Sequence, residues 1–324
     1  MPDRTTKIAV VGAGSVGATV AYAAMIRGVA KQIVLYDLNR KKVDAEVLDL
    51  NHGLQFAPMA SIEGSDDIGV CAGADVVVVT AGAKQKPGQS RMDLAGANVA
   101  ICRALLPGLL RVAPDAVLLM VTNPVDVLTY VAAKISGLPA KRVFGSGTVL
   151  DSSRFRFLIA RRLKVAVQSV HAYVAGEHGD SEVPLWSTAS VANVPLHEWA
   201  VAGHGKLTVR DRTEIFQNVK SAAYQIIEGK GATNYAIGLA TAKILEAVLH
   251  DEGRVLPVSS LLADWRPAGR PDEEPIGDVC MSVPSIVARA GIDAALRVPV
   301  NDAELAGLRA SADRIREAAR GLGF

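Results

Sequence analysis

The chain has 324 residues, which at roughly 150 residues per domain predicts about two domains with an ample core. Hydrophobic residues make up 50% and charged residues 21%, a composition that excludes disordered, collagenous and coiled-coil proteins. The 35 lysines and arginines nearly balance the 33 aspartates and glutamates, so a net charge of +2 predicts no binding to nucleic acid. Three scattered cysteines exclude a disulfide framework or a cysteine-based metal site and fit a reducing compartment.

The first half of the chain alternates short apolar runs with helical stretches. The runs predict buried strands at Lys7–Val11, Gln32–Tyr36, Asp75–Thr80 and Ala116–Val121. Each run is apolar on both faces, which is typical of a parallel sheet that helices cover on both sides. Helical patterns lie between them at Ala18–Arg27, Arg40–Leu50 and Met92–Val112. Residues 1–145 are therefore predicted to form a Rossmann-type, doubly wound α/β domain.

The pattern changes after residue 145 and predicts a mixed α+β domain over residues 146–324. We expect helices at 151–163, 211–228 and 234–249, and a strand over Ser169–Val174. Residues 264–275, rich in proline, glycine and charge, predict a surface loop between strands. Asn301 and Glu304 have the spacing of a capping box ahead of an amphipathic terminal helix.

The uncharged stretch at residues 8–26 has the composition of a signal peptide or a membrane span. Three glycines in its middle argue against a helix, because each would weaken one by about 1 kcal/mol. No other segment is expected to reach the length of a membrane span. The sequence thus predicts a cytoplasmic protein without a membrane segment.

The sequence GAGSVG at Gly12–Gly17 follows a predicted strand and opens a predicted helix, the context in which this motif indicates dinucleotide binding. Gly12 permits the tight turn, Gly14 lets the backbone approach a pyrophosphate, and Gly17 lets the helix pack on the strand. Asp37 ends the second strand, where a carboxylate accepts hydrogen bonds from ribose hydroxyls and repels a 2′-phosphate. The predicted cofactor is NAD, and no metal is expected.

Four polar residues form a candidate catalytic group. His178 lies in the glycine-flanked turn GEHGD, directly after an apolar strand. Asp151 and Arg154 are three residues apart at the start of a helix and therefore share a face. Arg91 ends the basic segment KQKPGQSR between a strand and a helix. Each residue alone is also compatible with a capping or surface role, and only their combination suggests catalysis.

These motifs give the chain a resemblance to the lactate/malate dehydrogenase family that runs from Lys7 to the terminal helix. The resemblance is most specific at GAGSVG, KQKPGQSR, VTNPVD, GSGTVLDSSRFR, GEHGD and EGKGAT. It implies NADH-dependent reduction of pyruvate to (S)-lactate and the reverse reaction, in a homotetramer with each active site between the two domains.

The resemblance also implies a role for each matching residue. His178 resembles the proton donor and acceptor, and Asp151 the carboxylate that holds its imidazole. Arg154 looks like the residue that binds the substrate carboxylate through a bidentate fork, and Arg91 like the one that polarises the carbonyl. Asn123 and Thr233 resemble residues that line the substrate pocket. The implied cofactor-binding set is Gly12, Ala13, Gly14, Ser15, Val16, Gly17, Asp37, Thr80, Ala81, Gly82, Thr122 and Asn123.

Gln85 resembles the position that selects the substrate in this family. Malate dehydrogenases generally have arginine there, which pairs with the second carboxylate of oxaloacetate, whereas lactate dehydrogenases have glutamine. A neutral amide would leave that carboxylate buried without an ion partner, at a cost on the order of 3–5 kcal/mol. Pyruvate is therefore the predicted substrate, with malate or another 2-hydroxy acid as the alternative.

Arg156 and His171 match the positions that bind fructose 1,6-bisphosphate in bacterial lactate dehydrogenases of the type activated by this effector. The resemblance implies a cationic pair at a subunit interface, which an anionic effector would bridge. Two ordinary bases on a helix and a strand are the alternative interpretation.

Other classes of function fit less well. A non-catalytic NAD-binding sensor would need the glycine motif and Asp37 but not the four polar residues together. The segment that begins His197-Glu198 lacks the second histidine of a zinc hydrolase. Gly229-Lys230-Gly231 lacks the preceding glycine-rich loop of a P-loop nucleotidase.

Overall fold

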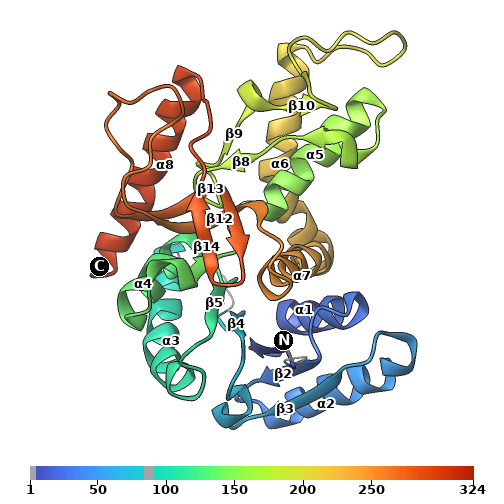
Figure 1. Cartoon of the computed structure of the whole chain (residues 1–324), viewed down its shortest axis with the longest axis vertical. Helices are drawn as coiled ribbons and strands as arrows, with labels where there is room; N and C mark the ends of the chain where they lie inside the picture. Colours follow the sequence, from blue (N-terminus) through green and yellow to red (C-terminus); the bar gives the residue numbers. More distant parts are fainter. Residues whose placement is uncertain (1–4, 84–90) are drawn as a thin grey trace.

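A computed structural model describes residues 5–83 and 91–324, without the side chains of Arg91 and Met92 (Figure 1). Its centre is a nine-stranded sheet with the order β14-β13-β12-β6-β5-β4-β1-β2-β3. The parallel part comprises β1 (Lys7–Val11), β2 (Gln32–Tyr36), β3 (Ser61–Ser65), β4 (Val76–Val79), β5 (Val117–Met120) and β6 (Val143–Gly145). This strand order is that of a dinucleotide-binding sheet, so the predicted fold class is confirmed.

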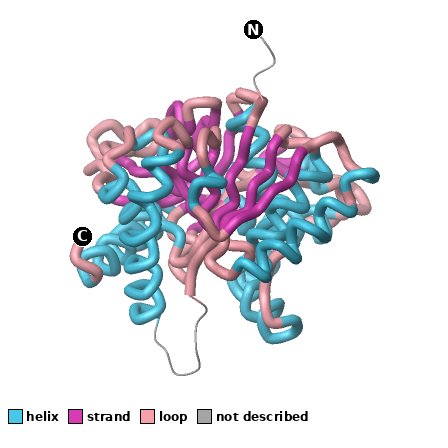
Figure 2. The backbone as a smooth tube through the Cα atoms, turned by 90° about the horizontal axis from the view of Figure 1, so that it is seen from below, coloured by secondary structure: helices cyan, strands magenta, loops and turns pink. Residues whose placement is uncertain are grey.

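Three antiparallel strands extend the sheet beyond β6. They are β12 (Arg254–Leu262), β13 (Val279–Ala288) and β14 (Gly291–Ala295). Figure 2 shows the strands across the middle of the molecule with helices on both sides.

Alternate side chains of the central strands enter two different cores. In β1, Ala9 and Val11 join the core beneath α3 (Arg91–Val112), α4 (Val125–Ser136) and α8 (Asp302–Gly321). Ile8 and Val10 join the core beneath α1 (Ser15–Arg27), α2 (Arg40–His52) and α7 (Tyr235–Leu249). This burial on both faces explains why the strands are apolar runs rather than alternating ones.

A smaller unit packs around a third core between α5 (Val149–Leu163) and α6 (Val209–Lys230). Its short strands are β7 (Val170–His171), β8 (Val174–Ala175), β9 (Val183–Pro184), β10 (Ser190–Val191) and β11 (Val194–Pro195). The predicted single strand over Ser169–Val174 is wrong, because β7 pairs with β10 while β8 pairs with β9 in a separate sheet.

The segment 264–275 does connect two strands, but it is anchored more firmly than a surface loop. Trp265 is buried, its ring N–H donates to the carbonyl of Leu296 at 2.8 Å, and its backbone pairs with Ile276. Arg270 forms an ion pair at 2.6 Å with Asp302, the first residue of α8. Local composition could not reveal these contacts with distant parts of the chain.

The expectation about membrane spans is wrong for one helix. Among the described helices, the segment Asp93–Val112 of α3 is long and apolar enough to cross a membrane by length and composition alone. Val99, Cys102, Leu106 and Leu109 of this segment lie in the core beneath the sheet. One face of α3 therefore packs on this core.

Candidate active site

The glycine motif forms a tight turn between β1 and α1 whose shape fits a dinucleotide. Gly12 has φ +100°, and a Cβ there would lie 2.7 Å from the backbone nitrogen of Ala81. A Cβ on Gly17 would lie 1.9 Å from the carbonyl oxygen of Gly12. A Cβ on Gly14 would instead face open space, with Lys42 Nζ as its nearest neighbour at 4.0 Å. The turn thus leaves open space beside Gly14, at the start of α1, for a pyrophosphate.

The N-terminus of α1 is suited to an anion. Its N-cap residue is Gly14, so no side chain caps the first turn, and the N–H groups of that turn have no side-chain acceptor in place of phosphate oxygens. Asp37 follows β2, and its carboxylate accepts from the backbone N–H groups of Ala13 at 2.7 Å and Asn39 at 2.9 Å. An acid in this position favours the ribose of NAD over the phosphorylated ribose of NADP.

Hydrogen bonds join the loops that follow β1, β4 and β5. Thr80 Oγ1 donates to the carbonyl of Gly12 at 2.9 Å, and Thr122 Oγ1 donates to that of Ala81 at 2.8 Å. Asn98 on α3, which sequence reasoning missed, accepts from the N–H of Ala83 at 2.7 Å and donates to the carbonyl of Asn123 at 2.8 Å. The predicted residues of this set therefore gather at the carboxyl edge of the sheet.

The predicted catalytic group surrounds one carboxylate. Asp151, in the first turn of α5, accepts from Arg154 at 2.8 Å through Oδ1 and lies 2.5 Å from His178 Nδ1 through Oδ2. The side chains of Asp151, Arg154 and His178 are 4%, 13% and 24% exposed. The structure thus brings together three residues that sequence reasoning grouped, and Nε2 is the ring nitrogen directed away from Asp151.

This arrangement strongly favours the charged imidazole. Burial opposes the charge, but the negative charge of Asp151 and the hydrogen bond to it, with smaller contributions from Asp126 and Glu182, raise the pKa of His178 to about 9. Burial likewise opposes ionisation of Asp151, but His178 and Arg154 hold the pKa of its carboxyl below the usual range. At neutral pH the imidazolium faces an ionised carboxylate.

Two further residues fix the turn that carries His178, and both were missed. Asp126 in the first turn of α4 accepts from the backbone N–H of His178 at 2.7 Å. Ser311 of α8 accepts from the N–H of Glu177 at 2.6 Å. The acid in the VTNPVD motif was a signal that could have identified Asp126, whereas nothing local singles out Ser311.

The remaining predicted residues lie in three places. Thr233 is half-buried between α6 and α7, where the adjacent Asn234 donates to Thr19 Oγ1 of α1 at 2.9 Å. Arg156 Nε donates to the carbonyl of Ala172 at 2.7 Å, next to the exposed His171 of β7. Gln85 lies outside the described residues, as does the side chain of Arg91, whose backbone begins α3.

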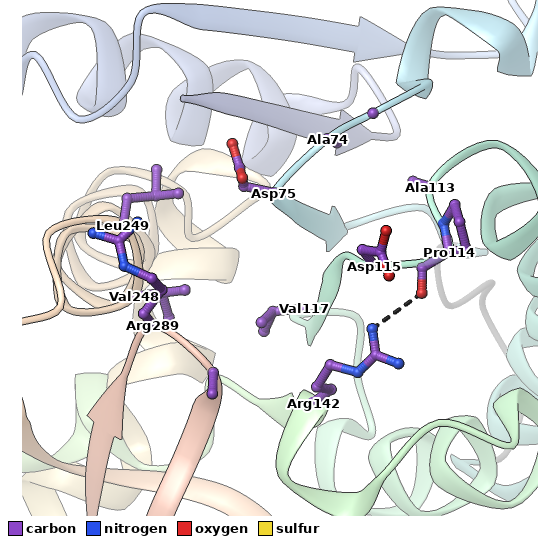
Figure 3. A pocket seen from close by; sticks show the side chains of 12 residues that line it. Ala74, Asp75, Ala113, Pro114, Asp115, Val117, Arg142, Val248, Leu249 and Arg289 are labelled. Carbon is purple, nitrogen blue, oxygen red and sulfur yellow. Dashed lines mark hydrogen bonds between the residues drawn. The ribbon is translucent and has the colours of Figure 1, made fainter. Parts of the chain in front are cut away.

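A separate pocket of about 220 Å³ lies at the opposite edge of the sheet, by the amino ends of β4, β5 and β6 (Figure 3). Arg142 closes one side, where its Nη1 donates to the carbonyl of Pro114 at 3.0 Å. Neither the glycine turn nor His178 lines this pocket, so it is not part of the candidate active site.

The sheet edge that fits a dinucleotide and the carboxylate-bound histidine beside a partly buried arginine define a nicotinamide-dependent dehydrogenase. The chain belongs to the lactate/malate dehydrogenase family. The model of the family's NAD-binding domain matches residues 6–145, and that of its α/β C-terminal domain matches residues 148–320. The predicted family and the predicted NAD cofactor are confirmed.

Two related proteins are similar to this chain over nearly its whole length. An L-lactate dehydrogenase of Bifidobacterium animalis subsp. lactis is 55% identical over 100% of this chain and 99% of its own. An L-lactate dehydrogenase of Acetivibrio thermocellus is 46% identical over 96% of this chain and 95% of its own.

Two solved structures share the fold throughout. A lactate dehydrogenase from a Medee basin deep-sea metagenome library has a TM-score of 0.91 at 37% identity, covering 99% of this chain and 100% of its own. The minor L-lactate dehydrogenase of Enterococcus mundtii in a ligand-bound form has a TM-score of 0.90 at 39% identity, covering 98% of each chain.

Substitution of Gly14 tests the cofactor turn. Gly14→Ala should fold with native stability, because its backbone has φ −73° and the new methyl group meets open space. The methyl group should occupy the space where the pyrophosphate approaches the backbone and weaken NADH binding at least about tenfold, or 1.4 kcal/mol, in a fluorescence titration. Gly229→Ala, which also meets open space, is the control. Unchanged NADH affinity in Gly14→Ala would contradict this placement of the cofactor.

Proposed function

We propose that this chain is an L-lactate dehydrogenase, which reduces pyruvate to (S)-lactate with NADH and catalyses the reverse reaction. The observation that carries the proposal is the pairing of His178 and Arg154 with the two oxygens of Asp151. A proton donor and a fork for a carboxylate are thereby held side by side, as a 2-oxo acid requires. The names of the similar proteins support the same activity.

Arg154 binds the substrate carboxylate in this mechanism. Its guanidinium uses one N–H for Asp151 and has others for a bidentate pair, a geometry that lysine cannot reproduce. Bound NADH supplies the hydride that adds to the carbonyl carbon. His178 donates its Nε2 proton to the carbonyl oxygen, and Asp151 keeps the ring oriented through Nδ1.

Further roles rest on the family resemblance. By this resemblance Arg91 would polarise the carbonyl, Asn123 would contact the nicotinamide and Thr233 would line the substrate pocket. The cofactor-binding set given above would hold the dinucleotide at the carboxyl edge of the sheet. We place the boundary between the cofactor and catalytic domains near residue 145. Limited proteolysis of the native protein tests this boundary.

A homotetramer and a cytoplasmic location are part of this proposal. Tyr22 and Ile26 of α1 and Tyr235 and Leu239 of α7 are large, exposed side chains on two helices that pack together. Large apolar side chains exposed on neighbouring helices support a subunit interface at this place. Sedimentation equilibrium that found a monomer would exclude the assembly, and recovery of the protein in a membrane or secreted fraction would exclude the location.

Removal of the charge on Asp151 should change the pH dependence of the reaction. Pyruvate reduction requires protonated His178, whose pKa of about 9 keeps activity high up to that pH. In Asp151→Asn only the smaller contributions of Asp126 and Glu182 still oppose the burial of the imidazole, so the pKa of His178 should fall toward or below 6.5. In the pH profile of kcat/KM for pyruvate, we expect the fall on the alkaline side to occur at least about 2 pH units lower than in the native protein. An alkaline limb that stays in place would show that another group titrates.

The choice of substrate depends on Gln85. NADH consumption by the purified protein should be much faster with pyruvate than with oxaloacetate. Gln85→Arg should reverse that preference through a gain of several hundredfold or more in kcat/KM for oxaloacetate, the equivalent of about 3–5 kcal/mol. Gln89→Arg adds the same charge to the same segment and is the control. Native preference for oxaloacetate would favour a malate dehydrogenase, and no turnover of either acid would favour a non-catalytic NAD-binding protein.

We also propose that Arg156 and His171 bind fructose 1,6-bisphosphate. Arg156 bonds to the chain at Ala172, the residue after His171, and its guanidinium lies 4.7 Å from the ring centre of Tyr173. The structure therefore supports a shared position for the two bases. Across a subunit interface such pairs would repel each other until an effector with two phosphates bridged them, which would favour the active assembly.

Fructose 1,6-bisphosphate should lower the half-saturating concentration of pyruvate at least about fivefold near neutral pH. The effect should disappear in Arg156→Gln and in His171→Gln. It should persist in Arg161→Gln, which removes an exposed base from the same helix. If the native protein does not respond, the effector site is excluded.

A further inference from the structure

Glu182 is a buried carboxyl group in the active-site turn that the mechanism above does not use. It lies four residues after His178 and directly before β9, and it is 6% exposed. Its backbone N–H donates to the carbonyl of Gly179 at 3.3 Å. Oε1 of its side chain is buried without a hydrogen-bond partner within the described part of the chain. An ionised carboxylate in that position would lose its solvation with no full replacement.

The charged groups that face Glu182 come from three elements. Asp151 and Arg154 lie on α5, His178 on the turn itself, and Lys220 on α6, where its ammonium also lies 5.4 Å from the ring centre of Phe216. Burial and the negative charge of Asp151 raise the pKa of Glu182 to about 8, because the three cations do not offset them.

The other carboxyl groups around His178 point the same way. Burial raises the pKa of Asp126 to about 6, so that carboxyl is ionised at neutral pH along with Asp151. A third ionised carboxyl beside Asp151 would add repulsion between negative charges to the cost of burial, and His178, Arg154 and Lys220 together do not offset that cost. Protonated Glu182 avoids it.

We propose that Glu182 is a positioning residue that acts through His178. It is neutral at and below neutral pH, and in alkaline solution it ionises and retains the proton on the imidazole. Glu182 does not touch the substrate. It widens the pH range over which the enzyme reduces pyruvate, and this inference rests on the proposed role of His178.

The test is the pH profile of kcat/KM for pyruvate with saturating NADH, from pH 6 to 10. Glu182→Gln keeps the shape of the protonated acid but cannot ionise. We expect unchanged activity at pH 7 and an alkaline limb that moves down by about one pH unit, because the neighbouring negative charge is lost. Glu182→Asp keeps an ionisable group and should restore much of the native limb.

Glu177→Gln is the matched control, since it makes the same change five residues earlier in the same turn. Its carboxylate is half-exposed and already accepts from Ser181, so its charge should act weakly on His178. Equal shifts in Glu182→Gln and Glu177→Gln would overturn the proposal, as would a native profile in Glu182→Gln.

Stability gives a second readout that does not depend on catalysis. A carboxyl whose pKa is about 8 in the folded protein and near 4.5 when unfolded makes the folded state lose stability as pH rises between those values. The melting temperature of Glu182→Gln relative to the native protein should therefore increase from pH 5 to pH 8. A constant difference would overturn the proposal. Full pyruvate activity in His178→Asn would instead refute the role of His178 and leave this stability result standing.

Discussion

The shared carboxylate of Asp151 is the interaction on which the active site depends. Each oxygen of this buried group has a different cationic partner, so movement of either His178 or Arg154 would leave one buried carboxylate oxygen without its partner. Asp151 and Arg154 lie three residues apart on α5, which fixes their separation through the helix backbone. One carboxylate thereby sets both the protonation of the imidazole and the place where an acid substrate binds.

The parallel sheet brings this group to the cofactor. Strands β1, β2, β4, β5 and β6 all end at one edge, so residues far apart in the sequence meet there. Thr80 and Thr122 bond the loops to one another, and Asp126, three residues after Asn123, holds the backbone of His178. The two domains are thus joined at the site by hydrogen bonds as well as by packing.

The sequence predicted features that depend on local pattern or on a familiar motif. The bounds of β1 and β2 were predicted residue for residue, because strands buried on both faces are continuous apolar runs. The break between β7 and β8 was missed, since it depends on which distant strand each pairs with. Glu182 was missed for a related reason. A glutamate in a polar turn looks exposed until the packing of α5 and α6 around it is known.

The contact with Ser311 decides which part of the site can form last during synthesis. The turn that bears His178 is bonded through Glu177 to this residue of α8, and a Cβ on Gly176 would lie 2.8 Å from its hydroxyl oxygen. Residues Asp302–Gly321 leave the ribosome last among the elements that contact the turn. A nascent chain can therefore form its cofactor edge while the catalytic turn still lacks the contact with Ser311, and that turn gains its support only after α8 has been synthesised.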